Sequence, residues 1–364
     1  CTLSKRYGNA VLPDVVTVDI LTEEKAQGSK AISRTLYKGL KETLESEKQS
    51  ILLINRRGFH TFAACNSCGS VICCPHCSIS MTYHSANNRL MCHYCGHSVP
   101  FSSVCPECGE DSVRYSGFGT QKIEDELKQL LPEARVVRMD TDSTSGKNSH
   151  ESLLDSFAKG EYDIMIGTQM VAKGLNFPNV TLVGVVSVDQ QLYNDDFRSL
   201  EKTFSLLTQV VGRSGRGEFA GKAIIQTLTP ENEVIRLAAK QDYDEFFKTE
   251  IRLRKALVYP PYCDLCVIGV VGENEIIVKS AARETLNLLK KYSNDDYKGE
   301  KMIVLGPMPA RVAKVNEKFR YRLIVKCRNS ARFRELISKV LIDMGNDSRF
   351  TKATVYADMN PDSA

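Results

Sequence analysis

The sequence predicts an α/β protein built on a parallel sheet, interrupted by a cysteine-rich module and followed by a smaller α+β domain. Three observations predict this: strands alternate with amphipathic helices, cysteines cluster in one segment, and the order of strands and helices changes toward the C-terminus. The chain has 364 residues, which at roughly 150 residues per domain corresponds to two or three domains. Hydrophobic residues make up 42% and charged residues 25%, which excludes a disordered or fibrous chain.

Neither the net charge of the chain nor its first residues identify a class of protein. Lys and Arg number 48 and Asp and Glu 44, and a net charge of +4 does not by itself identify a partner. No apolar run approaches the ~18 residues that cross a bilayer, so no membrane span is expected. The first residues lack an initiator Met and the pattern of a signal peptide, so we expect the chain to be part of something longer.

The parallel sheet is predicted from apolar runs that have the length of buried strands. These runs lie at 50–55, 135–140, 162–168, 181–188 and 221–227. Apolar residues at helical spacing predict helices over 121–131, 150–159 and 200–211, each of them before a strand. The cysteine-rich module is then an insertion after the first strand.

The cysteine-rich module contains nine of the 13 cysteines, and eight of these form pairs with the spacing C-x-x-C. The pairs are Cys65/Cys68, Cys74/Cys77, Cys92/Cys95 and Cys105/Cys108. Two residues between thiols let both sulfurs of one turn face one ion, and Zn²⁺ accepts four thiolates. Gly69, Gly96 and Gly109 each follow a pair directly, where positive φ lets the turn close. We therefore expect two Zn²⁺ ions, each held by four cysteines.

The order of the pairs favours a nested arrangement. One site is then formed by Cys65, Cys68, Cys105 and Cys108, and the other by Cys74, Cys77, Cys92 and Cys95. A sequential pairing leaves only five residues between the first two pairs, and an interleaved cross-brace is a further alternative. Iron–sulfur clusters also use four cysteines, but regular C-x-x-C-G turns favour zinc. Because four thiolates close the coordination shell, we expect structural sites that need neither His76 nor His93.

Glycines and basic residues gather in the α/β part of the chain. Arg56-Arg57-Gly58 follows the first predicted strand, and Gly167 to Phe177 follows another. Gln209-x-x-Gly-Arg-x-Gly-Arg216 ends a predicted helix and holds two guanidiniums, on Arg213 and Arg216, three residues apart. A guanidinium is always charged and presents a planar fork that suits phosphate. A flexible basic loop is the alternative for such a motif taken alone.

Taken in order, these features resemble one family, the PriA-type primosomal replication-restart helicases (primosomal protein N′). The matching features are Arg56-Arg57-Gly58, the four C-x-x-C pairs, Gly167-Thr-Gln-Met-x-Ala-Lys-Gly174, Asp196-Phe197-Arg198 and Gln209-x-x-Gly-Arg-x-Gly-Arg216. The resemblance covers essentially the whole chain, and the cysteine-rich insertion within a helicase lobe is its most specific feature. The chain departs from the family at Leu175-Asn176, where the family has His-Asp, and at Asp195, where the family has Pro.

The resemblance implies a domain plan and roles for particular residues. It implies the second RecA-like lobe of an ATP-driven motor, a zinc module and a ribosomal-protein-like C-terminal domain, with these boundaries: 1–57 start of the lobe after a connector, 58–115 zinc module, 116–229 remainder of the lobe, 230–259 helical linker, 260–364 C-terminal domain. Arg216 is the implied arginine finger, assisted by Arg213 and Gln209. The implied link between the bound nucleotide and the DNA backbone is formed by Thr168, Gln169, Lys173 and Gly174.

The sequence lacks the residues that would cradle and hydrolyse ATP without another lobe. It contains neither Gly-x4-Gly-Lys-Ser/Thr nor an acidic magnesium motif of the Asp-Glu-x-His type. We therefore expect the chain alone not to hydrolyse ATP. ATP and Mg²⁺ are expected as cofactors only together with a first RecA-like lobe, which we expect to precede this segment along with a DNA-binding region.

The C-terminal domain is predicted to be a small α+β sandwich that starts after Tyr259-Pro-Pro-Tyr262. Strands are expected over 265–271, 302–305, 321–325 and 353–356, with helices over 275–291 and 331–344. Nine Lys and Arg lie between Arg311 and Arg334, with Phe319 and Tyr321 among them. Basic side chains neutralise phosphates and aromatic rings stack on unpaired bases. The residues expected to contact DNA are Lys318, Arg320, Arg322 and Lys326; the alternative is a solvated hairpin with its aromatics in the core.

The resemblance implies an ATP-dependent DNA helicase that moves 3′ to 5′, recognises stalled or abandoned replication forks and assembles the primosome. Its implied partners are forked and single-stranded DNA, single-strand-binding protein, and primosome proteins including the replicative helicase and its loader. We expect a monomer without a membrane partner, in the bacterial cytoplasm and associated with the nucleoid. The competing hypothesis is a non-enzymatic, zinc-stabilised scaffold that binds nucleic acid or protein; Gln209, Arg213 and Arg216 discriminate, since a scaffold does not need them.

Overall fold

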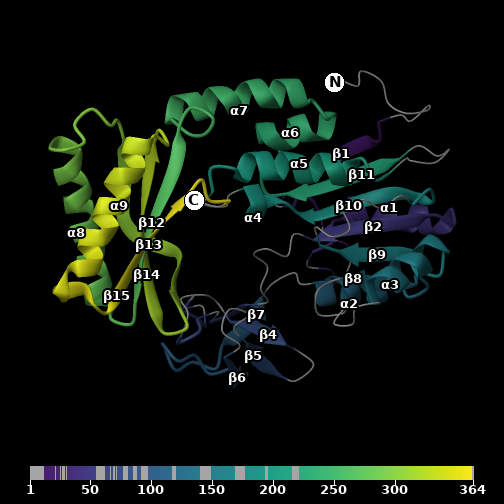
Figure 1. Ribbon diagram of the computed structural model, residues 1–364. Coiled ribbons are helices and arrows are strands. Elements are labelled where there is room, and N and C mark those ends of the chain that lie inside the picture. Colours follow the sequence, from purple (N-terminus) through teal and green to yellow (C-terminus); the bar gives the residue numbers. More distant parts are fainter. Residues whose placement is uncertain are drawn as a thin grey trace. The chain divides into compact units, whose positions relative to one another are not determined.

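The structure is a computed structural model of the chain (Figure 1). It divides into two compact units. Unit 1 comprises Cys1–His60, Gly117–Asn194 and Arg198–Lys248, and unit 2 comprises Thr61–Ser116, Asp195–Phe197 and Thr249–Ala364. The residues that the structure describes are 12–20, 22–24, 26, 29, 31–54, 62–65, 67–68, 70, 72–76, 81–84, 88–91, 97–116, 120–139, 149–168, 177–192, 196–214 and 221–362.

Unit 1 is a three-layer α/β domain around a six-stranded parallel sheet. The strands in spatial order are β1 (Asp14–Asp19), β11 (Lys222–Thr227), β10 (Val180–Ser187), β2 (Gln49–Ile54), β9 (Ile164–Gly167) and β8 (Val136–Met139). Every neighbouring pair is parallel. The helices are α1 (Arg34–Glu45), α2 (Thr120–Leu130), α3 (Ser149–Ala158), α4 (Asp189–Leu192), α5 (Ser199–Val211) and α6 (Glu233–Lys240).

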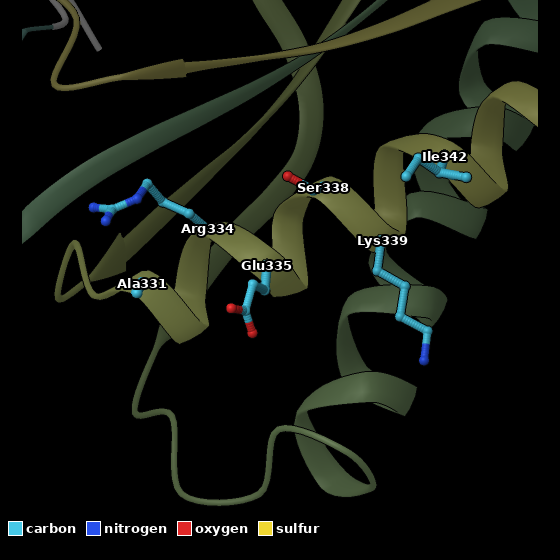
Figure 2. A pocket seen from close by; sticks show the side chains of 6 residues that line it. All are labelled: Ala331, Arg334, Glu335, Ser338, Lys339 and Ile342. Atoms are coloured by element: carbon cyan, nitrogen blue, oxygen red, sulfur yellow. The ribbon is translucent and has the colours of Figure 1, made fainter.

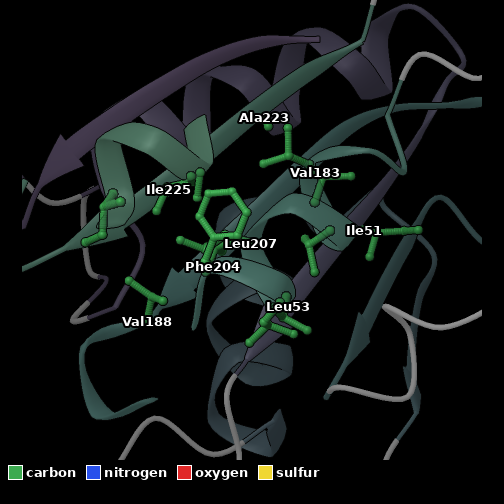
Figure 3. Packing of buried hydrophobic residues seen from close by; sticks show 14 of the residues in the cluster. Ile51, Leu53, Val183, Val188, Phe204, Leu207, Ala223 and Ile225 are labelled. Atoms are coloured by element: carbon green, nitrogen blue, oxygen red, sulfur yellow. The ribbon is translucent and has the colours of Figure 1, made fainter. Parts of the chain in front are cut away.

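Both faces of this sheet are covered by helices, because alternate residues of each strand point to opposite faces. In β2, Ile51 and Leu53 belong to one core, whereas Leu52 and Ile54 belong to the other. The first core contains residues of α3, α5 and α6, and Figure 3 shows Phe204 among the strand residues of that core. The second core contains residues of α1 and α2. The predicted parallel sheet with helices between its strands is confirmed.

Helix α1 lies close to the sheet because a glycine in β10 leaves room for it. A Cβ atom at Gly184 would lie 2.5 Å from Leu52 Cδ2 and 2.8 Å from Leu36 Cδ1. The helix begins at the N-cap Ser33, whose side chain accepts a hydrogen bond from the Leu36 backbone N–H at 3.2 Å. Close packing at this point places α1 directly against the centre of the sheet.

Unit 1 differs from the sequence-based expectation in three places. Strand β1 was expected to be a connector, but it pairs with β11 at the sheet edge, so the zinc module follows the second strand. Helix α1 was not predicted. The region 230–259, expected to be a helical linker, does hold two helices, α6 and α7 (Tyr243–Leu257), but Ile235 and Phe246 are buried in the first core of unit 1. The apolar face of α6 therefore belongs to the lobe.

Unit 2 contains an antiparallel five-stranded sheet within the cysteine-rich module. The strands in spatial order are β6 (Ser98–Pro100), β5 (Arg89–Met91), β4 (Thr82–His84), β3 (Phe62–Cys65) and β7 (Val113–Ser116). A small core lies beneath it, with Ala63 and Val113 fully buried and Met81 1% exposed. Because this core is so small, the module needs another source of stability.

The C-terminal domain of unit 2 is a two-layer α+β sandwich, as predicted (Figure 1). Its antiparallel strands in spatial order are β13 (Ile303–Val315), β14 (Lys318–Cys327), β12 (Asp264–Gly272) and β15 (Ala353–Met359). Helices α8 (Glu275–Asn294) and α9 (Ala331–Asn346) pack on one face, where Ile268, Leu323 and Leu336 are fully buried. A 3₁₀ turn, η1 (Ser348–Phe350), precedes β15. None of the described helices is both long and apolar enough to cross a membrane.

Candidate functional site

The outer cysteines of the module are brought together by two turns and one strand pair. Cys65 ends β3, where its backbone N–H donates to the Ser70 carbonyl at 2.8 Å. Cys105 begins the second turn, in which Gly109 has φ +77° and donates to the Cys105 carbonyl at 2.9 Å. This is the positive φ expected of a glycine directly after a C-x-x-C pair. Pairing of β3 with β7 places Cys65 opposite Val113.

The four outer thiols have the spacing of a tetrahedral zinc site. The sulfurs of Cys65, Cys68, Cys105 and Cys108 all lie within 4.8 Å of one another. Two of the separations, Cys65 Sγ to Cys108 Sγ and Cys68 Sγ to Cys105 Sγ, are 3.7 Å. Zinc–sulfur bonds of about 2.3 Å in a tetrahedron require sulfur–sulfur edges of about 3.8 Å. The donor set and its spacing therefore fit Zn²⁺, and such an ion would supply a cross-link between the two turns.

Hydrogen bonds around Cys65 favour its thiolate form. The Ser112 hydroxyl lies 2.9 Å from the Cys65 sulfur, and together with backbone hydrogen bonds from Cys68 and Ser67 it lowers the pKa of that thiol to about 6. Ser67 donates to Ser112 at 2.8 Å, which fixes the hydroxyl beside the sulfur. Since the thiolate is the form that binds a metal, this arrangement supports the ligand role of Cys65.

The inner cysteines lie mostly outside the described residues. Cys74 is buried at 4% exposure, whereas Cys77, Cys92 and Cys95 are not among the described positions. Cys73, the one cysteine of the module that belongs to no C-x-x-C pair, is exposed. The second zinc site therefore stays a prediction. His93 also lies outside the described residues, while His76 contacts His97 and Glu317.

Within unit 2, the zinc module contacts the turn between β13 and β14. Lys314 Nζ donates to the Pro75 carbonyl at 3.0 Å, and the Glu317 backbone N–H donates to the His76 carbonyl at 3.2 Å. Val315 packs against the small core of the module. Pro75 and His76, which lie between Cys74 and Cys77, thus bind the hairpin turn through their carbonyls.

The helicase-type motifs of unit 1 are described only in part. Thr168 follows β9 directly, whereas Gln169, Lys173, Gly174 and Arg216 lie outside the described residues. The segments with Arg56-Arg57-Gly58, Leu175-Asn176 and Asp195 also lie outside them. Gln209 is exposed on α5, and its amide donates to Ser205 Oγ at 3.0 Å.

Arg213 is held in a defined turn after α5. The Gly212 N–H donates to the Thr208 carbonyl at 3.1 Å, and the Arg213 N–H donates to the Val210 carbonyl at 2.9 Å. The Ser214 hydroxyl, in a residue only 3% exposed, donates to the Val211 carbonyl at 3.1 Å. These bonds fix the backbone from which the half-buried Arg213 side chain extends.

Two buried polar residues of the lobe were not identified from the sequence. Asp189, 5% exposed after β10, accepts hydrogen bonds from Thr227 Oγ1 at 2.6 Å and from the Leu228 N–H at 3.0 Å. Within the described part of the chain, its second carboxylate oxygen has no hydrogen-bond partner. Gln226, fully buried in β11, bonds the backbone at residues 31, 33 and 186. The only sequence signal was the presence of a polar residue within or directly after an apolar strand.

The basic residues of β14 lie on the face of the sheet opposite α8 and α9. Phe319 and Tyr321 point the other way into the helix-covered core, so the expectation that they stack on bases is wrong. Tyr321 is only 9% exposed and its hydroxyl donates to Glu275 at 3.2 Å. Lys318 is exposed, and Arg320 and Arg322 are half-buried on the open face.

Lys326 is withdrawn from this basic face. Its ammonium donates to the Leu257 carbonyl at 2.6 Å and lies 3.7 Å from the ring centroid of Tyr259, and burial lowers its pKa. Tyr259 in turn stacks on Phe197 of the Asp-Phe-Arg motif, with ring centroids 5.0 Å apart and an interplanar angle of 2°. The Arg254 guanidinium lies 5.3 Å from the Phe197 centroid. Lys326 therefore has a structural role and is removed from the set expected to bind DNA.

A shallow hollow of about 490 Å³ lies along the outer side of α9 (Figure 2). It is lined by Ala331, Arg334, Glu335, Ser338, Lys339 and Ile342. Lys339 Nζ donates a hydrogen bond to Asp296 Oδ2 at 2.5 Å. The hollow holds none of the residues predicted to bind metal, nucleotide or DNA.

Three known families match successive parts of the chain. Residues 74–100 match the PriA DNA helicase Cys-rich region (CRR) domain, which includes the inner cysteines. Residues 114–218 match the helicase conserved C-terminal domain, and residues 255–362 match the primosomal protein N C-terminal domain. Along the chain, these matches fall in the insertion, in the part of the lobe that follows it, and in the C-terminal sandwich.

Whole-chain relatives agree with these matches. Replication restart protein PriA of Bacillus subtilis is 42% identical over 99% of this chain and 44% of its own length. The protein of the same name from Synechocystis sp. is 38% identical over 99% of this chain and 42% of its own. Among solved structures, RecG bound to a three-way DNA junction is 11% identical at a TM-score of 0.36, over 69% of this chain and 23% of that one.

The fold and the matches define the C-terminal lobe of a helicase, with a cysteine-rich zinc region inserted into it. A second C-terminal domain specific to primosomal proteins follows that lobe. The chain belongs to the PriA family of replication restart proteins. It spans less than half the length of the curated relatives it matches.

Proposed function

We propose that this chain is the C-terminal part of an ATP-dependent DNA helicase that moves 3′ to 5′, recognises stalled or abandoned forks and restarts replication by assembling the primosome. The observation that carries the proposal is a four-thiol cluster inserted into a helicase-type parallel sheet, between β2 and α2. The relatives, which are named replication restart proteins, support it over nearly the whole chain.

The proposed machinery is divided between the chain and the rest of the protein. Arg216 stabilises the charge on the transferring phosphoryl group, Arg213 and Gln209 assist, and the segment from Thr168 to Gly174 links the nucleotide to DNA. ATP and Mg²⁺ bind together with a first RecA-like lobe. Two Zn²⁺ ions stabilise the module, one at each nested set of four cysteines.

The proposed DNA contacts are the basic residues Lys318, Arg320 and Arg322 on the open face of the C-terminal sheet. Their charge suits the phosphate backbone of single-stranded or forked DNA. The proposed protein partners are single-strand-binding protein and the replicative helicase with its loader, and we propose that the protein acts as a monomer in the bacterial cytoplasm.

Reconstitution of ATP hydrolysis tests the proposal. The chain alone is expected to show no ATPase, whereas the chain joined to the N-terminal part of the protein is expected to show ATPase that single-stranded DNA stimulates. Release of phosphate is measured with and without DNA. If the joined protein binds two Zn²⁺ and DNA but does not hydrolyse ATP, the helicase proposal fails and the zinc-stabilised scaffold remains as the function.

A further inference from the structure

The open face of the C-terminal sheet carries an aromatic residue that lies in register with the basic residues. Strand pairing places Gly269 of β12 opposite Arg322 of β14 on one side and opposite Tyr356 of β15 on the other. Directly paired residues share a face, so Arg322 and Tyr356 flank Gly269 on the same face of the sheet. The next row toward the hairpin contains Arg320, Val271 and Thr354.

The ring of Tyr356 lies over the backbone of β12. A Cβ atom built at Gly269 would lie 2.2 Å from Tyr356 Cζ and 2.5 Å from its hydroxyl oxygen, so only glycine leaves room for the ring. Tyr356 nevertheless remains 41% exposed. One side of the ring therefore covers the sheet, and the other is accessible from solvent, which makes a flat aromatic surface at a fixed position.

The charges beside this ring suit a polyanion. Arg320 and Arg322 extend from the same face, and the Arg320 side chain forms no hydrogen bond or ion pair with another residue of the described part of the chain. Asp358 is exposed on the same face of β15 and pairs with Val267. It lies in the row beyond Tyr356, on the side away from Arg320. The positive charge thus lies in the row of Tyr356, on Arg322, and in the next row toward the hairpin, on Arg320.

We propose that Tyr356 is a stacking platform for one unpaired base of a single strand whose phosphates lie along Arg320 and Arg322. This inference rests on the proposed DNA binding of the C-terminal domain and assigns the base-contacting residue within it. A ring lying flat on a sheet reaches a splayed base but not one stacked inside a duplex. The site therefore selects single-stranded over double-stranded DNA.

Binding measurements on the whole chain test the platform. With a fluorescein-labelled oligothymidylate, Tyr356→Ala is expected to weaken affinity by about five- to 150-fold, and Tyr356→Phe, which keeps the ring, by less than about threefold. Tyr262→Ala is the matched control, because Tyr262 is similarly exposed at 46% but lies outside the basic face. A blunt duplex is expected to bind all these variants alike.

The absence of Trp from the chain allows a direct reading of stacking. In Tyr356→Trp, the single indole is expected to lose fluorescence when the oligothymidylate binds and to keep it when the duplex binds. The corresponding Tyr262→Trp variant is expected to keep its fluorescence with both.

Two results separate this inference from the function on which it rests. If the unmodified chain binds the oligothymidylate but Tyr356→Ala binds it equally well, and the Tyr356→Trp signal does not change, the stacking role is refuted and DNA binding stands. If the unmodified chain does not bind the oligothymidylate, the DNA-binding proposal fails, and the platform fails with it.

Discussion

Replacing one thiol of the four-cysteine cluster is expected to remove one metal ion and to loosen the module around it. Cys105 is the informative position, because it is 1% exposed and its sulfur lies 3.7 Å from that of Cys68. In Cys105→Ser the hydroxyl replaces a thiolate, so three strong ligands remain. Water cannot easily complete the coordination at a position this buried.

The magnitude follows from dividing the binding free energy among the ligands. Structural zinc sites bind with about 10–16 kcal/mol at neutral pH, so one of four equivalent thiolates contributes about 2.5–4 kcal/mol. Affinity is therefore expected to fall by about 100- to 1,000-fold. Because binding and folding are linked, the loss should also increase hydrogen exchange over residues 59–115 before it affects the lobe.

Zinc content per chain and competition with a chromophoric chelator measure the effect. In the presence of a chelator whose zinc affinity lies between those of the intact and the altered site, the unmodified chain is expected to hold two equivalents of Zn²⁺ and Cys105→Ser one. Cys73→Ser serves as the control, because Cys73 is exposed beside a predicted ligand but does not belong to the four-thiol cluster. The proposed ligand set would be refuted if Cys105→Ser retained two equivalents of Zn²⁺ or if Cys73→Ser lost one. Release of iron instead of zinc would refute the identity of the metal.

Two further substitutions test the packing of the lobe by urea denaturation. Gln226→Leu removes the amide that bonds the Ser33 N–H and the Ala31 carbonyl. At about 1–3 kcal/mol for each of these two buried groups left unpaired, we expect a loss of about 2–6 kcal/mol in unfolding free energy. An unchanged midpoint would show that the network contributes nothing to stability. Gly184→Val places a Cβ atom 2.5 Å from Leu52 Cδ2. Overpacking is expected to lower the unfolding free energy by about 1–3 kcal/mol. Unchanged stability would mean that α1 can move away from the sheet.

Local patterns predicted most of the fold. Apolar runs located β2 and β10 because these strands are buried on both faces, where every residue is apolar or nearly so. The same criterion missed β1, whose apolar run in Asp-Val-Val-Thr-Val-Asp is short and whose residues are mostly only half-buried at the edge of the sheet. Helix α6 was placed in a helical linker because its local sequence does not show that α5 covers its apolar face.

The candidate sites were predictable to the extent that they depend on spacing. The cysteine intervals were sufficient to propose the nested set, and the structure brings Cys65 and Cys108 within 3.7 Å. Lys326 could not be distinguished from Arg320 or Arg322 in this way, because its cover comes from Tyr259 in a distant segment. Tyr356 was missed for a related reason: a base-stacking role requires knowing that it lies over Gly269 on the basic face.

The rate of ATP hydrolysis in Arg216→Ala, within the protein joined to its N-terminal part and saturated with single-stranded DNA, is the most direct test of the motor assignment. An arginine finger accounts for about 10³- to 10⁵-fold in turnover, so we predict a kcat at least about 10³-fold lower, with zinc content and DNA affinity unchanged. A variant that hydrolyses ATP at the unmodified rate would contradict the assignment of this lobe as half of the motor.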